Sequence, residues 1–580
     1  MSRLLPLLAL TLAAGCAKNT TKGTQGNTDG TGGEGEGEGE EVVEPLAFTL
    51  TAPSSGAIVR DSNVVAEGSW SGGLDTVVTV NGVDVGPEGT FAVDSAHTDV
   101  PWPDSPLWPV LGDARDAEGS WLRARSTLIH GDSAPALDPI DDGLMFRLTD
   151  NVLAQLDVLL DTLVADLDLS ELLVGSDPVG SILVADVYIT GASFGDLIPS
   201  LDFESSGLAY SLRAEDVLIE MVIDAGFLGT YDADLEAAAI IISGDLVIGV
   251  DGSGGLTATP SNTSVATEDL ELFGFTDSIG LVDSLLGDTI AATVEEQLVD
   301  AIDGLLEAQE DLRYLEFSGI AIVSDFTSAL HDNNGVTILA DSRLELTDGT
   351  EPGDRLATDA SWSVPTGSDS PGGVPYQAGL FLDDDLLSAL GASLAAGDLL
   401  KQEVSGDLGS ITLDTSLLGA IVPGFDTLPA GQLVTLVTRP SAPLVGQAGR
   451  EGYAGELHIG GLELDFKTDE DGDGTDDVVM TVVVDAVVGL APGEDGELLS
   501  IDLVESRATL LSTSLPASPD EVEPGLASLI DLAVPALVGG LLGDALDLSL
   551  GGIGLEIVDG AGVGDRAALF LDLDLSGFEL

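Results

Sequence analysis

An apolar stripe with helical spacing runs through the middle of the chain, from Thr276 to Leu312. Steps of three and four residues separate its members, which place them on one face of a helix. They are Ile279, Val282, Leu286, Ile290, Val294, Leu298, Ile302 and Leu305. A stripe of this length must be covered, and the flanking segments are short, aliphatic and alternating in polarity. They predict a sheet as the partner of this helix.

The same order of helices and strands occurs twice after residue 140. Alternating strands are predicted between residues 182 and 250 and again between 432 and 510. Helices are predicted on both sides of each strand block, at 144–163, 276–312, 383–394 and 522–542. Internal repetition of this kind indicates a duplicated module. The mixture of helices and antiparallel strands predicts an α+β fold.

The first 15 residues are typical of an export signal. A basic residue, Arg3, precedes an apolar run that is too short to span a bilayer. The following Leu12-Ala13-Ala14-Gly15-Cys16 resembles the bacterial lipobox, in which the signal is cut before a cysteine that then receives a diacylglycerol. We therefore expect a lipoprotein with Cys16 as its lipidation site, and Ala17 after it favours the outer membrane or cell surface.

A Gly-rich acidic stretch follows the cysteine, at 16–45, and it cannot bury enough apolar surface to fold. It is predicted to be a tether. The next segment, 46–131, has short alternating runs between turn signals, of which Asn81-Gly82 is the strongest hairpin signal. This segment predicts an all-β sandwich and resembles bacterial immunoglobulin-like modules. It is either a spacer or a contact surface, since Trp102, Trp108 and Trp121 lie within it.

Charge excludes several functions. Eighteen Lys and Arg stand against 101 Asp and Glu, a formal net charge of -83. Such a chain repels polyanions, so we expect no nucleic-acid partner. Four isolated histidines and the absence of a Ser/His/Asp order or a phosphate-binding loop give no catalytic constellation, and the protein is predicted not to be an enzyme. No organic cofactor is expected.

Local runs in the second half carry a family resemblance. Residues 380–390 (LFLDDDLLSAL), the segment 418–423, Arg439-Pro440-Ser441-Ala442-Pro443 and a closing hairpin of 548–558 with 567–575 are similar to the bactericidal/permeability-increasing and lipopolysaccharide-binding protein family. The resemblance covers about residues 140–580. It implies two tandem tubular halves, each a helix wrapped by an antiparallel sheet, with a central sheet between them. The halves would be 140–316 and, with the central strands, 317–580.

The same resemblance implies an apolar groove that takes lipid acyl chains. Burial of each CH2 group would contribute about 0.8 kcal/mol. We therefore expect a membrane-anchored lipoprotein that binds or transfers lipid. The alternative is a surface adhesion or scaffold protein whose sandwich makes the contact. The groove residues expected on the helices are Leu156, Leu160, Leu163, Leu286, Ile290, Val294, Leu298, Leu387, Leu390, Leu394, Leu537 and Leu541.

One acidic turn has the composition of a calcium site. Four carboxylates between two predicted strands surround Gly474, and hard oxygen ligands suit Ca2+. The turn resembles the calcium-binding turns of exported repeat proteins, whereas a solvated hairpin tip explains the same residues equally well. The candidate ligands are Asp469, Asp471, Asp473 and Asp477.

Overall fold

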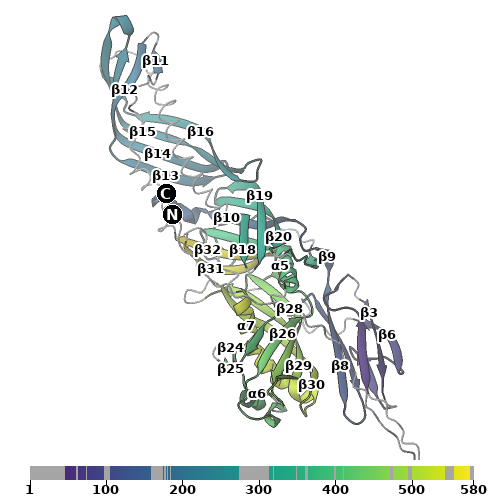
Figure 1. Cartoon of the computed structure of the whole chain (residues 1–580). Helices are drawn as coiled ribbons and strands as arrows, with labels where there is room; N and C mark the ends of the chain where they lie inside the picture. Colours follow the sequence, from purple (N-terminus) through teal and green to yellow (C-terminus); the bar gives the residue numbers. More distant parts are fainter. Residues whose placement is uncertain are drawn as a thin grey trace, which may run out of the picture. The chain divides into compact units, whose positions relative to one another are not determined.

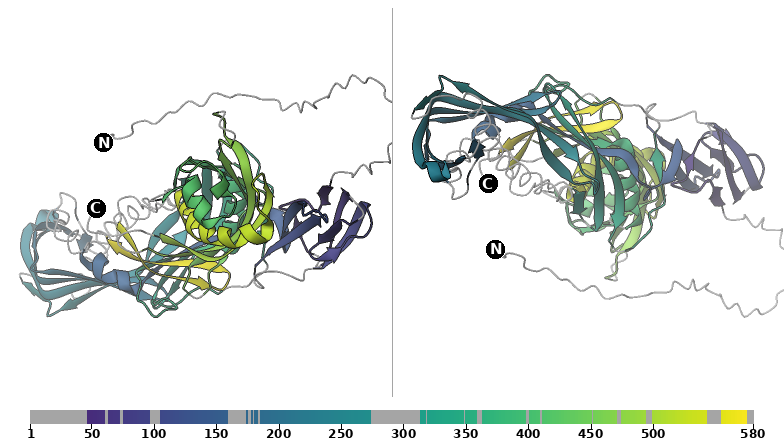
Figure 2. Two further views of the ribbon diagram at one scale, coloured as in Figure 1. Left: turned by 90° about the horizontal axis from the view of Figure 1, so that it is seen from below. Right: turned by 90° about the horizontal axis from the view of Figure 1, so that it is seen from above.

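The computed structural model describes residues 46–574 with internal gaps, of which the longest are 97–104, 159–173, 274–312 and 543–553. Figures 1 and 2 show the chain from three sides. The predicted helix at 276–312 and the predicted lipidation site Cys16 lie outside the described residues. No helix in the described chain is long and apolar enough to cross a membrane.

The prediction of an α+β body with two helix-wrapped tubular halves is wrong. The described chain is mainly β-strand, arranged in several sheets (Figure 1). Its α-helices with defined ends are α5 (Asp384–Ala396), α6 (Thr415–Ile421) and α7 (Pro519–Leu542). One cause of the wrong prediction is the segment 144–163, for which a helix was expected. An apolar run is compatible either with a helix or with a strand that is buried on both faces.

The structure places a central strand at the start of that segment. The strand is β10 (Ile140–Thr149), and a 3-10 turn, η1 (Asp150–Val152), follows it. Met145 and Phe146 are successive residues of β10 that point to opposite faces, and both are buried. Burial on both faces removes the alternation that would have identified the strand in the sequence.

Residues 47–130 form two sheets around a shared core. Sheet A has the order β1-β3-β6, and sheet B has the order β2-β8-β7-β4-β5. Buried Ala66, Val80 and Leu128 lie in the core between them. Asn81 and Gly82 have φ angles of 47° and 75°, as a two-residue hairpin requires, and they join β4 to β5. The strands are β1 (Ala47–Ala52), β2 (Ile58–Val59), β3 (Asn63–Ser71), β4 (Val77–Val80), β5 (Val83–Asp84), β6 (Gly89–Ala96), β7 (Leu107–Arg115) and β8 (Trp121–His130).

A seven-stranded antiparallel sheet, sheet D, joins segments far apart in the sequence. Its order is β18-β19-β20-β10-β22-β32-β31, so the last described strand, β32, lies beside β22. Its strands besides β10 are β18 (Tyr314–Phe317), β19 (Ile320–Asp332), β20 (Gly335–Leu346), β22 (Ala378–Asp383), β31 (Gly554–Val563) and β32 (Arg566–Asp574). The buried Arg147 of β10 donates to both carboxylate oxygens of Asp332, at 2.9 and 3.0 Å.

Sheet E is built from the long strands between residues 180 and 273. Its path is β11-β12-β14-β15-β16, while β13 and β17 pair with β14 and β15. The two longest strands, β14 (Gly207–Asp224) and β15 (Thr230–Val250), are joined by the 3-10 turn η2 (Gly226–Leu228). The others are β11 (Gly180–Ile182), β12 (Ala185–Ser193), β13 (Leu197–Glu204), β16 (Leu256–Glu268) and β17 (Glu271–Phe273).

Sheet G forms the core of the second half together with α6 and α7. Its path is β23-β26-β28-β29-β30, with β27 paired to β28. The strands are β23 (Glu403–Ser405), β26 (Thr435–Pro440), β27 (Val445–Ala448), β28 (Gly455–Thr468), β29 (Asp477–Pro492) and β30 (Leu499–Thr513). Two small ribbons complete the described strands, β9 (Asp132–Pro135) with β21 (Asp354–Ala357) and β24 (Asp407–Leu408) with β25 (Ile411–Thr412), and a 3-10 turn, η5 (Phe425–Thr427), follows α6.

The sandwich of sheets A and B packs on sheet G through buried polar contacts. Arg125 and Asp485 form an ion pair in which the side chains are 3% and 2% exposed. Ser105 Oγ lies 3.2 Å from Nδ1 of His458, and burial, aided by the charge of Arg450, lowers the pKa of His458 to about 4. This imidazole is therefore neutral near pH 7. The sandwich belongs to the same compact unit as the rest of Pro45–Leu580.

Candidate lipid-binding surfaces

One face of sheet E is apolar along its two longest strands, and we call it the inner face. On β14 the buried side chains alternate with exposed or half-buried ones, as do those of β15. Eighteen residues in a strand extend about 60 Å. The inner face consists of Leu208, Tyr210, Leu212, Ala214, Val217, Ile219, Met221 and Ile223 of β14 and Ala233, Leu235, Ala237, Ile240, Ile242, Leu246 and Ile248 of β15.

A change of phase on both strands keeps this face continuous. The pairing of β14 with β15 keeps one register from Leu208–Leu246 to Asp224–Thr230 and omits only the position where Ala238 lies opposite Asp216. The φ angle of Asp216 is 48°, in the left-handed region that an Asp tolerates. At this position the buried residues of β14 change from even to odd numbers, between Ala214 and Val217. The facing residues of β15 change in the same way, from Ile240 to Ala237, so the inner face stays apolar on both strands.

Charge is confined to the other face of the sheet. No charged side chain is among the buried residues of β11–β17 as far as these strands are described. The outer face carries ion pairs such as Arg213 with Glu215 at 3.0 Å and Arg213 with Glu268 at 2.7 Å. The inner face is therefore apolar and carries no charged side chain among its described residues.

Among the described elements, sheet D contacts this face near the end of β15 that contains Ile248. Among described elements, the main contacts of sheet E outside itself are made with β19 and β20. Nε2 of His331 lies 2.8 Å from the carbonyl oxygen of Ile248, near the end of β15. Ala233 and Leu235 are at least 13 residues from Ile248 along the strand, which corresponds to about 40 Å. The inner face thus extends well beyond its contact with the central sheet.

The equivalent space in the second half is filled. On α7, Val522, Leu526, Ile530 and other apolar side chains are buried against sheet G. The cavity that remains between them has a volume of about 10 Å³ and an entirely apolar lining. That volume is close to the minimum for one water molecule. The space holds no room for an acyl chain while α7 is in this position.

The predicted groove residues on α5 also lie in a packed core. Leu387 is 5% exposed and Leu394 4%, and Leu390 is half-buried against the core cluster that contains Leu394. A methyl group added at Gly446 would lie 2.2 Å from Cβ of Leu387, so the helix and β27 approach each other closely. These leucines hold α5 against its neighbours. A lipid-lining role for them stays a prediction.

The other predicted groove residues have little described environment. Leu156 is half-buried and packs at the edge of the cluster that contains the inner face of sheet E. Leu537 and Leu541 lie within α7, but their side chains are outside the described residues. The remaining members lie outside the described chain altogether: Leu160, Leu163, Leu286, Ile290, Val294 and Leu298.

Sequence reasoning placed the groove on helices and missed the inner face of sheet E. The alternation of polarity in 207–250 predicted strands, and the same alternation identifies which side chains share a face. What obscured the surface was the change of phase at Asp216, because it divided β14 into two apparent strands. Allowing one change of phase at Glu215-Asp216 would have joined them.

The predicted calcium turn lies between β28 and β29. Asp471 and Asp473 are outside the described residues. Asp469 accepts a hydrogen bond from the backbone N–H of Gly474 at 3.1 Å, and Asp477 begins β29. Among the described residues, no group of three or more His, Cys, Asp or Glu side chains could hold a metal ion. A calcium ion in this turn stays a prediction, which calcium titration of wild type against Asp471→Asn/Asp473→Asn can test.

A buried acidic cluster marks the start of α5. Asp383 accepts from the N–H of Asp385 at 2.9 Å and lies 3.3 Å from Arg566, and the N–H of Asp384 donates to the carbonyl of Asp565 at 3.1 Å. Burial raises the pKa of Asp383 to about 6. Burial, with the charges of Asp383 and Asp565, raises the pKa of Asp384 to about 8. The cluster therefore favours the protonated form of the Asp384 carboxyl group near neutral pH.

Comparison with known proteins gives distant matches to solved structures. A scan of protein-family models and a search of curated proteins find no match. A crystal structure of lipopolysaccharide binding protein matches with 15% sequence identity and a TM-score of 0.41, covering 75% of this chain and 99% of that one. P47 of Clostridium botulinum E1 matches with 10% identity and a TM-score of 0.26, covering 75% and 100% of the two chains.

Proposed function

We propose that this protein is a lipid-binding lipoprotein that holds acyl chains against the inner face of sheet E. The observation that supports this most is the unbroken apolar surface along β14 and β15, with all charge on the opposite face. Apolar surface removed from water contributes about 25 cal/mol per Å². Hydrocarbon is the ligand chemistry that such a surface favours, because it presents no charged group to orient a polar one.

Membrane anchoring through Cys16 is the second part of the proposal. It is supported by the sequence Leu12-Ala13-Ala14-Gly15-Cys16 and by the glycine-rich acidic tether that follows. An anchored protein with an acyl-binding face would bind or transfer lipid at the outer membrane or cell surface. Labelling cells with a radioactive fatty acid tests the anchor, since wild type should incorporate the label and Cys16→Ser should not.

Two adjacent alanines provide a matched test of the binding face. Ala237 lies on the inner face and is 6% exposed, whereas Ala238 is exposed on the outer face. A Phe at 237 occupies space at the inner face, and a Phe at 238 projects into solvent. We expect Ala237→Phe to weaken binding of a fluorescent fatty acid by about tenfold, equivalent to about 1.4 kcal/mol. Ala238→Phe should bind as wild type does.

The result is interpretable only if both variants keep their fold. Overpacking a core typically costs about 1–3 kcal/mol, so circular dichroism and thermal unfolding must accompany the binding titrations. Equal affinities for the fatty acid in folded wild type, Ala237→Phe and Ala238→Phe would show that the inner face of sheet E is not the binding surface.

A further inference from the structure

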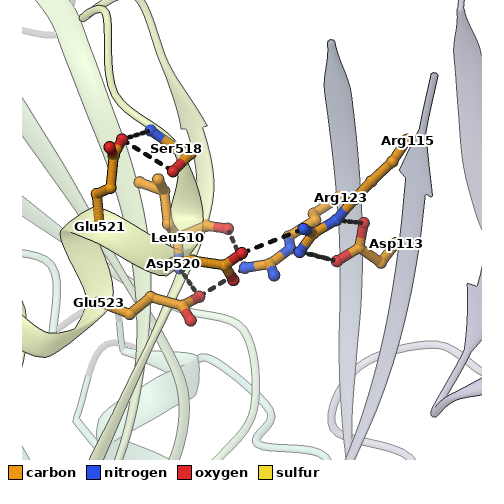
Figure 3. Close-up of polar contacts among 8 residues, drawn as sticks. All are labelled: Asp113, Arg115, Arg123, Leu510, Ser518, Asp520, Glu521 and Glu523. Atoms are coloured by element: carbon orange, nitrogen blue, oxygen red, sulfur yellow. Dashed lines mark hydrogen bonds and ion pairs between the residues drawn. The ribbon is translucent and has the colours of Figure 1, made fainter. Parts of the chain in front are cut away.

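The first turn of α7 is held by arginines of the sandwich, and we call this set of contacts the clasp (Figure 3). Nη1 of Arg123 lies 2.5 Å from Oε1 of Glu523, and its Nε donates to Asp113 at 3.0 Å. At the periphery, Nη1 of Arg115 lies 3.4 Å from Asp520. Two strands of the sandwich, β7 and β8, thereby contact the helix that covers sheet G.

Arg123 is the central member of the clasp. Its side chain is 6% exposed and that of Glu523 29%, whereas Arg115 and Asp520 are 44% and 73% exposed. Exposed ion pairs contribute little, whereas a buried charge such as that of Arg123 is costly to leave without a partner. Glu523 also accepts from the backbone N–H of Leu510 at 3.1 Å, and Arg123 donates to the carbonyl of Leu510 at 3.4 Å. The pair therefore connects the sandwich, α7 and β30.

The clasp acts at the end of α7 that favours negative charge. Glu521 caps the start of the helix, because its carboxylate accepts from both the N–H and the hydroxyl of Ser518, at 3.0 and 2.9 Å. Acidic side chains in the first turn of a helix interact favourably with its dipole. Asp520 and Glu523 thus stabilise the helix end and bind the arginines at the same time. Another polar contact of the helix, Asp531 with Ser506 at 3.0 Å, lies on its exposed side.

Beyond its first turns, apolar packing holds α7 to the sheet, and the helix contains a weak point. Pro535 has no N–H, so the helix lacks the hydrogen bond to the carbonyl of Asp531. Such a position is a common site of helix bending. Before Pro535, the apolar face of α7 covers Leu464, Phe466 and Val482 of sheet G across the small apolar cavity. Lifting this part of the helix would expose a second apolar surface.

We propose that α7 is a lid over the apolar face of sheet G, that the sandwich keeps it closed through Arg123 and Glu523, and that release of this clasp admits a lipid acyl chain. The inference rests on the proposed function for the ligand class and extends it to a regulated second site. It also gives the sandwich a role within the chain, as the element that controls the lid.

Charge reversal at Arg123 tests the clasp directly. The full chain carrying Arg123→Glu places a second acid opposite Glu523, whereas Arg343→Glu makes the same charge change at a half-exposed pair on sheet D. Hydrogen exchange of the amides at 522–534 reports whether α7 opens. We expect Arg123→Glu to speed this exchange by about tenfold or more and Arg343→Glu to leave it unchanged.

A photo-crosslinkable fatty acid, mapped by mass spectrometry of peptides, then reports where lipid binds. In wild type we expect crosslinks on β14 and β15 alone, and in Arg123→Glu additional crosslinks on β28 and β29. Unchanged exchange in α7 would refute the clasp, and faster exchange without crosslinks on sheet G would refute the lid. Loss of the β14 and β15 crosslinks in wild type would count against the proposed function, while new crosslinks on sheet G would still support the lid.

A milder variant guards against misfolding of Arg123→Glu. Glu523→Gln removes the charge but keeps an amide oxygen that can accept from Leu510 N–H. We expect it to increase exchange and sheet G crosslinking in the same direction by a smaller factor. If a folded Glu523→Gln variant matches wild type in both measurements, the charge pair does not control the helix.

Discussion

Replacing Arg147 by Met is expected to destabilise the protein by about 3–5 kcal/mol, because it leaves a partly buried carboxylate without its partner. The Arg147 side chain is fully buried in the middle of sheet D. It donates to Asp332 through both Nη atoms, to Thr337 Oγ1 at 2.8 Å and to the carbonyl of Gly367 at 3.0 Å. Met fills a similar volume and satisfies none of these acceptors.

The expected loss can be measured by urea unfolding together with hydrogen exchange in β10 and β20. A matched control is Arg343→Met, since Arg343 is 36% exposed and pairs with Asp325 at 3.3 Å on the same sheet. An exposed pair contributes about 0–1 kcal/mol, so this variant should stay close to wild type. Similar losses of unfolding free energy in the two variants would show that the buried network of Arg147 stabilises sheet D no more than the exposed pair does.

The buried acidic cluster at α5 predicts that stability falls as the pH rises. The pKa of Asp384 is about 8 in the folded chain, above its usual value of 3.8, so the folded state binds the proton more tightly than the unfolded state. Its contribution to stability is complete below about pH 4 and is lost as the pH rises through 8. A tenfold difference in proton affinity between the two states corresponds to about 1.4 kcal/mol, so we expect a decline of a few kcal/mol.

Asp384→Asn should flatten this decline, because an amide resembles the protonated acid and does not ionise. The free energy of unfolding of wild type and of Asp384→Asn should be measured between pH 5 and pH 9. The difference between the two proteins is the quantity to compare, because the net charge of -83 affects the stability of both alike. Asp234→Asn, an exposed carboxylate on the outer face of sheet E, is the control. A constant difference between wild type and Asp384→Asn over this range would contradict the assignment.

Local patterns in the sequence predicted most of the strands. The strand expected at 335–346 is β20, and the helix expected at 383–394 is α5 with ends shifted by one or two residues. Each of these elements has a periodic pattern and a clear boundary, such as Gly335 with a φ angle of 156° or Asp383 as the helix cap. Where the periodic pattern and the boundary signal agree, neighbouring residues are enough to predict the type and the ends of an element.

The overall fold class could not be predicted in the same way. Buried Met145 and Phe146 conceal the strand character of β10, and the change of phase at Asp216 conceals the length of β14. The ion pairs that connect distant segments have no local signal either, since Arg147 lies 185 residues from Asp332 and Arg125 lies 360 from Asp485. The candidate surface was missed for the same reason, because it exists only once β14 and β15 pair along their whole length.

Mass spectrometry of lipid that co-purifies with the chain tests the central proposal most directly. The full chain should carry Cys16→Ser, so that a covalent anchor is not counted as bound lipid. The proposal predicts non-covalently bound lipids with long acyl chains when sheet E is unaltered, a reduced amount in Ala237→Phe and no reduction in Ala238→Phe. Recovery of no lipid from any of these folded proteins, with no uptake of added fatty acid, would contradict it.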